Sequence, residues 1–233
     1  MRGLFVTGTD TGVGKTVVTA ALALALRERG VDAGVVKPVE TGDGDAAVLA
    51  RLAELADGPG EIAPFSFAAP LAPLVAARLE GVELRLGEVA ERVRALAQGR
   101  ELVLVEGVGG LLCPVGPGWT IADLAAELGL PALVVARASL GTINHTLLTV
   151  REARRLGLDV TGVVLNGRGD ESEATNGELI ESFASVPIVA RVPQLEGGPT
   201  SERLRALGLD PEPALGCRLP QPAGREAAGG ERR

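Results

Sequence analysis

Two lysine-bearing segments have the residue types needed to bind and transfer a phosphate. One is the glycine-rich stretch Gly8-Thr-Asp-Thr-Gly-Val-Gly-Lys-Thr16, and the other is Lys37-Pro-Val-Glu-Thr-Gly42. Glycines let the backbone curve around an anion, a lysine can contact the β- and γ-phosphates, and the hydroxyl of Thr16 can ligate Mg²⁺. The first segment therefore predicts a nucleotide-binding loop.

The two lysines stand out against the rest of the chain. Lys15 and Lys37 are its only lysines, and arginine supplies the other 21 of its 23 Lys and Arg residues. An ammonium is a compact charge on a flexible stem, whereas a guanidinium is a planar fork that does not lose its proton. Lysines kept in these two contexts indicate functional positions.

The glycine-rich stretch departs by one position from the pattern G-x-x-x-x-G-K-[ST]. That pattern requires glycine at position 9, where this chain has Thr9, with Gly8 one residue earlier. Its context still fits, because an apolar strand at residues 4–6 precedes the loop and a helical pattern follows from Thr16. A dinucleotide site of the G-x-G-x-x-G type is excluded, because Gly12-Val13-Gly14 is not followed by a glycine at position 17.

Carboxylates that could complete a magnesium site occur at two places. Glu106 ends the apolar run Leu102-Val-Leu-Val-Glu106 and is followed by Gly107, so it is expected at the ligand-binding edge of the sheet. Asp45 opens a predicted helix, where an N-cap is the simpler interpretation of the residue taken alone.

The elements that must position these residues alternate between strand and helix. Apolar runs predict strands near residues 3–8, 33–39, 101–106, 132–137, 160–166 and 187–192, and helical patterns fall at 16–29, 45–56, 85–98, 120–128, 142–156 and 173–184. Several of these helices are followed by glycine, as at Gly30, Gly99, Gly129 and Gly157. The pattern predicts an α/β fold, a parallel sheet flanked by helices on both faces, of the P-loop NTPase type.

Two segments break the alternation. Residues 58–81 are rich in Pro and Ala and could form a substrate loop or a subunit contact. After about Asp210 the chain is rich in Pro, Gly and Arg, so we expect a single catalytic domain over residues 1–210 and a flexible tail over 211–233.

Composition excludes several classes of function. A net charge of −7 without a basic stripe argues against nucleic acid as a partner. Cys113 and Cys217 are too few for a disulfide framework or a zinc site. The sequence runs directly into a strand without a signal peptide, and no apolar stretch approaches the ~18 residues of a membrane span, so a cytoplasmic location is expected.

Four motifs together, at residues 8–16, 37–42, 105–110 and 141–145, give the chain its family likeness. With them, in this order, the chain resembles the dethiobiotin synthetases, ATP-dependent cyclo-ligases of biotin synthesis. The resemblance covers residues 1–195. Related partitioning ATPases carry lysine where Asp10 stands, and cobyrinate-type amidotransferases add a glutaminase domain for which this chain has no room.

The resemblance implies roles for individual residues. Lys37 and Lys15 would be catalytic, and Thr16, Asp45 and Glu106 would surround Mg²⁺. Thr11, Lys37 and Thr41 would contact the substrate, and so would Gly141, Thr142 and Asn144, which open a helix reaching the substrate tail from the other subunit of a homodimer. ATP would be bound by Gly12, Val13, Gly14, Lys15, Thr16, Val17, Asp45, Glu106, Gly107, Val108, Gly109, Asn166, Pro193, Gln194 and Leu195. The aspartate usual after Asn166 is Gly167 here.

The implied reaction converts 7,8-diaminononanoate, CO₂ (or bicarbonate) and ATP into dethiobiotin, ADP and phosphate, with Mg²⁺ as cofactor. The alternatives are another ligase or metal-insertion ATPase of the same branch, a nucleotide-switched binding protein, or a non-catalytic relic. Lys37-Pro38-Val39 and residues 141–145 argue against the first, and Asp10 argues against the second.

Overall fold

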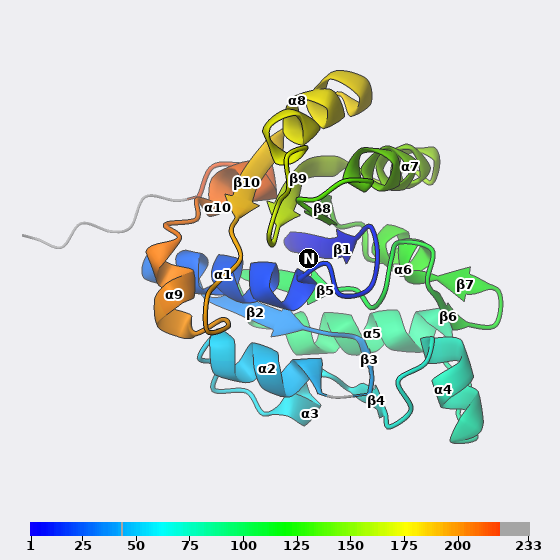
Figure 1. Ribbon diagram of the computed structural model, residues 1–233. Coiled ribbons are helices and arrows are strands. Elements are labelled where there is room, and N and C mark those ends of the chain that lie inside the picture. The colour runs from blue at the N-terminus through cyan, green and yellow to red at the C-terminus, as the bar shows by residue number, and fades with distance from the viewer. Residues whose placement is uncertain (43, 220–233) are drawn as a thin grey trace, which may run out of the picture.

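A computed structural model describes residues 1–42 and 44–219. Its centre is a six-stranded sheet in the order β10-β9-β8-β1-β5-β2, in which every neighbouring pair is parallel (Figure 1). The strands are β1 (Gly3–Gly8), β2 (Ala33–Val36), β5 (Leu102–Glu106), β8 (Ala132–Arg137), β9 (Val160–Asn166) and β10 (Ile188–Val192). The predicted α/β class and all six predicted strands are confirmed.

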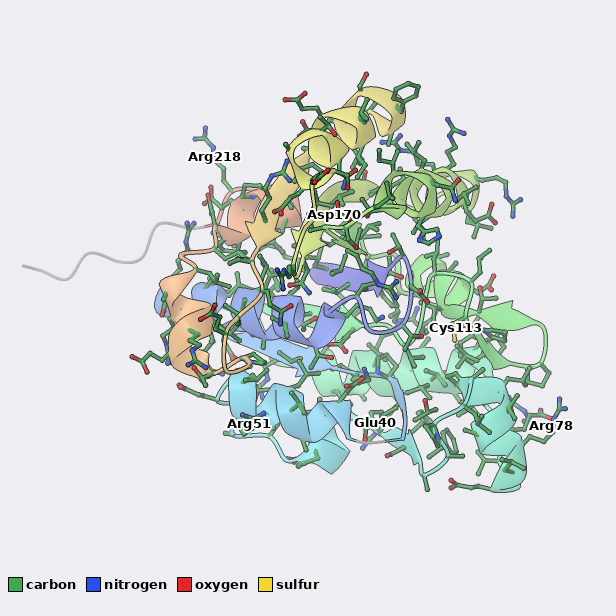
Figure 2. The ribbon with its side chains drawn as sticks, in the orientation of Figure 1. Glu40, Arg51, Arg78, Cys113, Asp170 and Arg218 are labelled. Carbon is green, nitrogen blue, oxygen red and sulfur yellow. The ribbon has the colours of Figure 1, made fainter. Side chains whose placement is uncertain are left out.

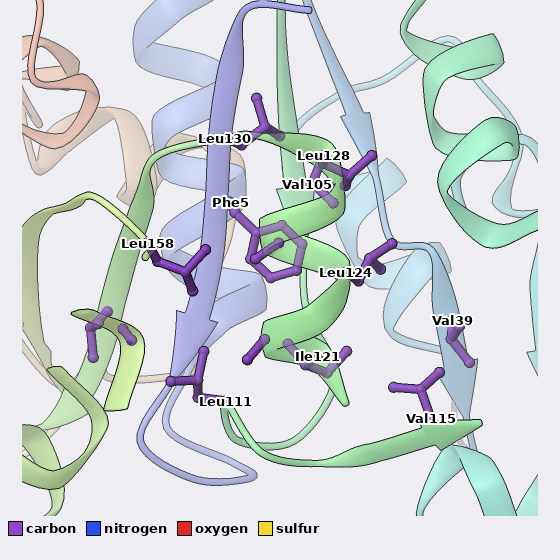
Figure 3. Packing of buried hydrophobic residues seen from close by; sticks show 14 of the residues in the cluster. Phe5, Val39, Val105, Leu111, Val115, Ile121, Leu124, Leu128, Leu130 and Leu158 are labelled. Atoms are coloured by element: carbon purple, nitrogen blue, oxygen red, sulfur yellow. The ribbon is translucent and has the colours of Figure 1, made fainter. Parts of the chain in front are cut away.

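Side chains of the central strand alternate between two cores, one on each face of the sheet. Leu4 and Val6 face one core, and Phe5 faces the other, where it packs with Val105 of β5 and Leu124 (Figure 3). All of these side chains are buried. This period-2 alternation in a strand covered on both sides explains why the strands read as continuous apolar runs.

Helices cover both faces, as predicted. The face that includes Leu4 is covered by α1 (Lys15–Glu28), α2 (Asp45–Leu52), α9 (Ser201–Ala206) and α10 (Pro211–Leu215). The opposite face is covered by α5 (Leu86–Ala97), α6 (Ile121–Leu128), α7 (Thr142–Arg155) and α8 (Glu173–Ala184). The glycines expected just past helix ends, at positions 30, 99, 129 and 157, all have positive φ, the conformation in which glycine commonly ends a helix.

Short elements that were not predicted interrupt the alternation. Within the Pro- and Ala-rich segment lie α3 (Pro59–Ile62), β4 (Phe65–Phe67) and α4 (Pro73–Leu79). Strand β4 pairs in parallel with β3 (Val39–Thr41), and β6 (Pro114–Gly116) pairs with β7 (Trp119–Thr120). These elements, of two to seven residues, are too short to show a clear period in the sequence.

Part of the segment expected to be a flexible tail forms a helix. Residues 211–215 form α10, whose Asp210 side chain accepts from the backbone N–H of Glu212, and Ala214 and Leu215 are buried against the sheet. Proline at the first position and an Asp cap favour a helix start, which the Pro content had concealed. The last part of the predicted tail, residues 220–233, lies outside the described residues.

None of the helices in residues 1–42 and 44–219 combines the length and the apolar character that crossing a bilayer requires.

Candidate active site

The glycine-rich loop joins the end of β1 to the start of α1. Gly12 and Gly14 have φ of 72° and 92°, and Gly14 is the N-cap of α1. A Cβ atom at Gly14 would lie 1.9 Å from Asn166 Nδ2, so glycine is required here both by conformation and by space. The loop thus presents the amide groups of a helix start next to the end of β9, an arrangement suited to an anion.

Lys15 connects the two glycine-rich loops of the site. Its Nζ donates to the carbonyl oxygens of Asp10 at 3.0 Å and Gly109 at 2.7 Å. Burial lowers the pKa of Lys15 below its ordinary value, the Glu106 carboxylate opposes that shift, and the Lys37 charge adds to it. The ammonium is therefore a buried cation held between the loop after β1 and the loop after β5.

Lys37 lies between two carboxylates. Its Nζ donates to Asp45 Oδ2 at 2.6 Å and to Glu106 Oε1 at 2.7 Å. The side chain of Lys37 is 1% exposed and that of Glu106 is 0% exposed. Burial acts to lower the pKa of Lys37, but the charges of Glu106 and Asp45 outweigh it and raise the pKa above its ordinary value. Lys37 is accordingly a fixed positive charge at neutral pH.

The expected role of Asp45 as an N-cap is wrong. The N-cap of α2 is Gly44, and Asp45 is the first helical residue, with its carboxylate directed to Lys37. The sequence could not separate the two positions because Gly44 and Asp45 are both common at helix starts.

The oxygen atoms near Glu106 suit a hard cation. Thr16 Oγ1 donates to Glu106 Oε1 at 2.9 Å, while the buried Glu106 Oε2 has no hydrogen-bond partner among the described residues. A carboxylate with a free buried oxygen next to a hydroxyl is the type of donor set that Mg²⁺ takes, with the remaining positions left to water or phosphate. No cluster of three or more His, Cys, Asp or Glu residues suited to a metal occurs in the described part of the chain.

A cavity of about 710 Å³ opens over these groups. Its lining combines apolar side chains with the charged groups of Lys15, Lys37 and Asp45, and it includes Cys113, which is labelled in Figure 2. The described residues that line it are Thr11, Gly12, Gly14, Lys15, Thr16, Lys37, Thr41, Asp45, Pro70, Leu71, Ala72, Pro73, Val108, Gly109 and Cys113. The structure therefore brings residues of the phosphate loop, both lysines and two of the three predicted substrate threonines, Thr11 and Thr41, into one cavity.

The sequence of this chain is similar to those of known proteins. A family model described as "AAA domain" matches residues 2–198. The ATP-dependent dethiobiotin synthetase BioD of Anaeromyxobacter sp. (strain K) is 57% identical over 178 residues, which cover 74% of this chain and 80% of that protein. The BioD of Bacillus licheniformis is 43% identical over 205 residues, covering 84% of this chain and 87% of that one.

The chain belongs to the dethiobiotin synthetase family. Solved structures with a similar fold include the MinC:MinD cell division complex of Aquifex aeolicus, with a TM-score of 0.60, 15% identity and coverage of 94% of this chain and 98% of that one. MinD of Pyrococcus horikoshii, complexed with Mg-ADP, gives a TM-score of 0.54 at 19% identity, covering 92% and 93% of the two chains. At these identities the likeness concerns the fold, and it confirms the predicted P-loop NTPase type.

Four of the residues predicted to bind ATP, Asn166 and residues 193–195, lie beyond the phosphate loop in this member of the dethiobiotin synthetase family. Asn166, at the end of β9, donates from Nδ2 to the carbonyl of Val13 at 2.8 Å. Pro193, Gln194 and Leu195 follow β10 directly, and the Gly167 N–H donates to the carbonyl of Val192 at 2.9 Å. The ends of β9 and β10 thus form a border on the far side of the loop from Lys37.

The predicted substrate-tail residues do not line the cavity. Gly141 is the N-cap of α7 with φ of 91°, and Thr142 is buried with its hydroxyl 3.5 Å from that of Thr146. Gly141, Thr142 and Asn144 are absent from the described residues around the cavity, and Val13, Val17 and Gly107 are absent as well.

Three contributors to the site were not among the predicted site residues. Residues 70–73 line the cavity and belong to the segment 58–81, which the sequence marked only as a possible substrate loop or subunit contact. Cys113 also lines it, and burial raises the pKa of its thiol while the nearby Lys15 partly offsets the rise. Arg137 Nη2 donates to Asp10 Oδ2 at 3.0 Å and so holds the phosphate loop from the end of β8; its position at a strand end was the available signal.

Proposed function

We propose that this chain is a cytoplasmic, ATP-dependent dethiobiotin synthetase that joins 7,8-diaminononanoate and CO₂ into the ureido ring of dethiobiotin, with ATP converted to ADP and phosphate. The observation that supports this most is that Lys15, Thr16 and Lys37 line one cavity, while the buried Glu106 is hydrogen-bonded to both Thr16 and Lys37. Membership of the dethiobiotin synthetase family supports the choice of substrates.

The first step forms a carbamate. A neutral amine of the diamine attacks CO₂, its lone pair forms the C–N bond, one C=O pair moves to oxygen, and the nitrogen loses a proton. The hydroxyls of Thr11 and Thr41 line the cavity and can hold the amine and the new carboxylate. The apolar wall at residues 70–73 would contact the hydrocarbon chain of the diamine.

The second step joins two anions. A carbamate oxygen attacks the γ-phosphorus of ATP, the bond to the β–γ bridging oxygen breaks, and ADP leaves. In a chain of net charge −7, the positive field must be local, and Lys15, Lys37 and the amides at the start of α1 supply it. Lys37 is suited to contact carbamate and phosphate together, because an ammonium has three donors around a compact charge.

Thr16, Asp45 and Glu106 would hold Mg²⁺, which when bound neutralises charge on the β- and γ-phosphate oxygens. The protein's part in this is to keep the three oxygen ligands in place, and the partly buried hydrogen bond between Thr16 and Glu106 serves that purpose.

The last step closes the ring. The second amine attacks the carbonyl carbon of the mixed carbamic-phosphoric anhydride, the bond from carbon to the phosphate oxygen breaks, and phosphate leaves. No side chain becomes covalently attached at any step. The protein acts by holding both amines and the anhydride in one cavity, which replaces encounters between separate molecules.

Two further roles belong to the proposal. Asn166 and residues 193–195 would contact the adenine of ATP.

A homodimer would place Gly141, Thr142 and Asn144 of one subunit at the substrate tail in the other. Leu140 and Leu148 beside this helix start are 81% and 59% exposed, and a subunit contact would cover these apolar side chains.

The proposal is tested by steady-state phosphate release with each component omitted in turn, alongside mass detection of the product. Release should be slow with ATP and Mg²⁺ alone, because water is a poor acceptor in a site arranged for a carbamate. It should rise when the diamine and bicarbonate are both present, with one dethiobiotin per phosphate. Full-rate hydrolysis without the diamine, or no ureido product, would overturn the assignment.

A further inference from the structure

Four charged side chains are buried in the described part of the chain: Lys15, Lys37, Glu40 and Glu106. Three of them have roles in the reaction proposed above. Glu40, which is 6% exposed, has none there. A buried carboxylate is costly to keep unless hydrogen bonds compensate for lost water, so its contacts indicate what it does.

Both oxygens of Glu40 accept a hydrogen bond. Oε2 accepts from the backbone N–H of Ala46 at 2.6 Å, and Oε1 accepts from Ser66 Oγ at 3.0 Å. The salt bridges among the described residues do not include Glu40. Its charge is therefore stabilised by neutral donors from two other segments rather than by a cation.

The contact with Ala46 gives α2 the cap that its own sequence lacks. Gly44 is the N-cap and has no side chain to accept from the first amides of the helix. Glu40 supplies that acceptor from β3, next to the first turn of α2 (Figure 2). A carboxylate at this position satisfies an otherwise free N–H and also interacts favourably with the helix dipole. Ala46 directly follows Asp45, so this bond fixes the turn that carries Asp45.

The contact with Ser66 connects the same carboxylate to the strand that leads into residues 70–73, which also line the cavity. Glu40 and Ser66 are register partners in the β3–β4 pair. The Gly42 N–H donates to the carbonyl of Phe67 at 2.9 Å, and a Cβ atom at Gly42 would lie 2.9 Å from Pro70 Cβ. One side chain thus links the segment with Thr41, the start of α2, and the strand that leads into residues 70–73.

We propose that Glu40 is a positioning residue that holds Asp45 in place for Lys37 and for Mg²⁺. It acts through the first turn of α2 and touches neither substrate nor nucleotide. The proposal deepens the function proposed above and rests on it in one respect, the role of Asp45 as a metal ligand. Partners that orient a metal ligand typically change metal affinity or activity by about 10- to 100-fold when they are removed.

The test compares Glu40→Ala with Glu40→Gln. Glu40→Ala should weaken Mg²⁺-ATP binding about tenfold in calorimetric titrations, leave metal-free ATP binding unchanged, and speed hydrogen exchange of the Ala46 amide. Glu40→Gln keeps an oxygen for that amide and should stay within about threefold of the original protein, since only the charge assistance is lost. Loss of thermal stability in Glu40→Ala without a change in Mg²⁺ dependence would overturn the proposal.

Glu61→Ala is the matched control. Glu61 Oε2 accepts from the backbone N–H of Gly58 at 2.7 Å at the start of the neighbouring helix α3, so it too is a carboxylate at a helix start, but it does not line the cavity. This variant should leave Mg²⁺-ATP binding and exchange at Ala46 unchanged.

A double-mutant cycle shows whether Glu40 acts through Asp45. In the Asp45→Asn background, Glu40→Ala should add little to the loss of Mg²⁺-ATP binding, whereas additive losses would contradict the proposal. Binding and hydrogen exchange need no turnover. Absence of dethiobiotin from the original protein would therefore refute the proposed function, while the Glu40 measurements would still decide the positioning role.

Discussion

Lys37 Nζ donates to Glu106 Oε1 at 2.7 Å, and both side chains are almost completely buried. Removing one partner of such a pair leaves an uncompensated charge in the interior, which typically costs about 3–5 kcal/mol of stability. The pair therefore constrains which substitutions can test catalysis without also unfolding the protein. Replacements that keep the charge are the informative ones.

Lys37→Arg keeps the charge but changes its shape. The space between Asp45 and Glu106 holds a compact ammonium at 1% exposure, and a guanidinium cannot present three donors around one point. Turnover should fall at least ~10²-fold, the scale for losing one preorganised electrostatic contact, while the fold and most nucleotide binding remain. Phosphate-release kinetics and calorimetric ATP titrations measure the two quantities. Near-normal turnover would exclude the role assigned to Lys37.

Thr16→Ala removes a proposed oxygen ligand of Mg²⁺ and its hydrogen bond to Glu106. Binding of Mg²⁺-ATP should weaken far more than binding of metal-free ATP, because a hard cation loses a ligand while the phosphate contacts remain. Thr16→Ser is the matched control, since it keeps the hydroxyl. Equal losses with and without Mg²⁺ would speak against the metal site.

The alkaline side of the pH profile should come from Lys15. Burial lowers its pKa below the ordinary 10.5, so the free enzyme loses this charge at a lower pH than an ordinary lysine would. The value of kcat/KM for ATP, which reflects the free enzyme, should therefore decline before pH 10.5. The value of kcat should decline at higher pH, because bound triphosphate favours the charged form.

The lowered pKa of Lys15 also determines how the stability of the folded protein changes with pH. Between the lowered pKa and 10.5 the unfolded chain binds more protons than the folded one at Lys15, so this residue makes stability rise with pH there. Lys37 acts oppositely, because its raised pKa gives a stabilisation that is present below 10.5 and lost as pH passes its own pKa.

The kinetic prediction for Lys15 can also fail. A kcat/KM profile for ATP that is flat through pH 10.5 would contradict the assignment of the alkaline decline to Lys15.

Mixing two inactive variants tests the shared site. In a homodimer of the proposed kind, Lys37→Arg chains, which keep the buried charge, and Asn144→Ala chains form hybrids in which one site has both residues intact. Random exchange makes about half of the dimers hybrids, so activity should return to about a quarter of the original level. Subunit exchange is verified with differently tagged chains. If exchange occurs without recovery, both residues serve the same subunit.

Much of the fold could be predicted because its main elements are long and regular. Five of the six parallel strands are mostly buried on both faces, which produces apolar runs, and several of the helices are followed by a glycine with positive φ. Strands β3 and β4 escaped prediction because a three-residue pair has no measurable period. Helix α10 escaped because a Pro-rich composition concealed its Asp210 cap.

The parts of the candidate site that form local sequence motifs could be predicted. The contacts between residues that are distant in the sequence could not. The glycine-rich loop and Glu106 at the end of β5 carry local signals. The position of Lys37 between Asp45 and Glu106 depends on strands β2 and β5 lying side by side, which no local pattern contains. Glu40 gave no signal, because its partners at Ala46 and Ser66 come from two separate segments.

The side chain of Asn166 fills the space beside Gly14 and holds the carbonyl of Val13. The residue that we propose to contact adenine is thus also a brace for the loop that cradles phosphate. Base selectivity and triphosphate affinity are therefore linked traits in this scaffold. Replacing Asn166 to accept another base would also remove its hydrogen bond to the glycine-rich loop. A variant designed to bind another nucleotide would therefore need a new contact from the end of β9 to that loop.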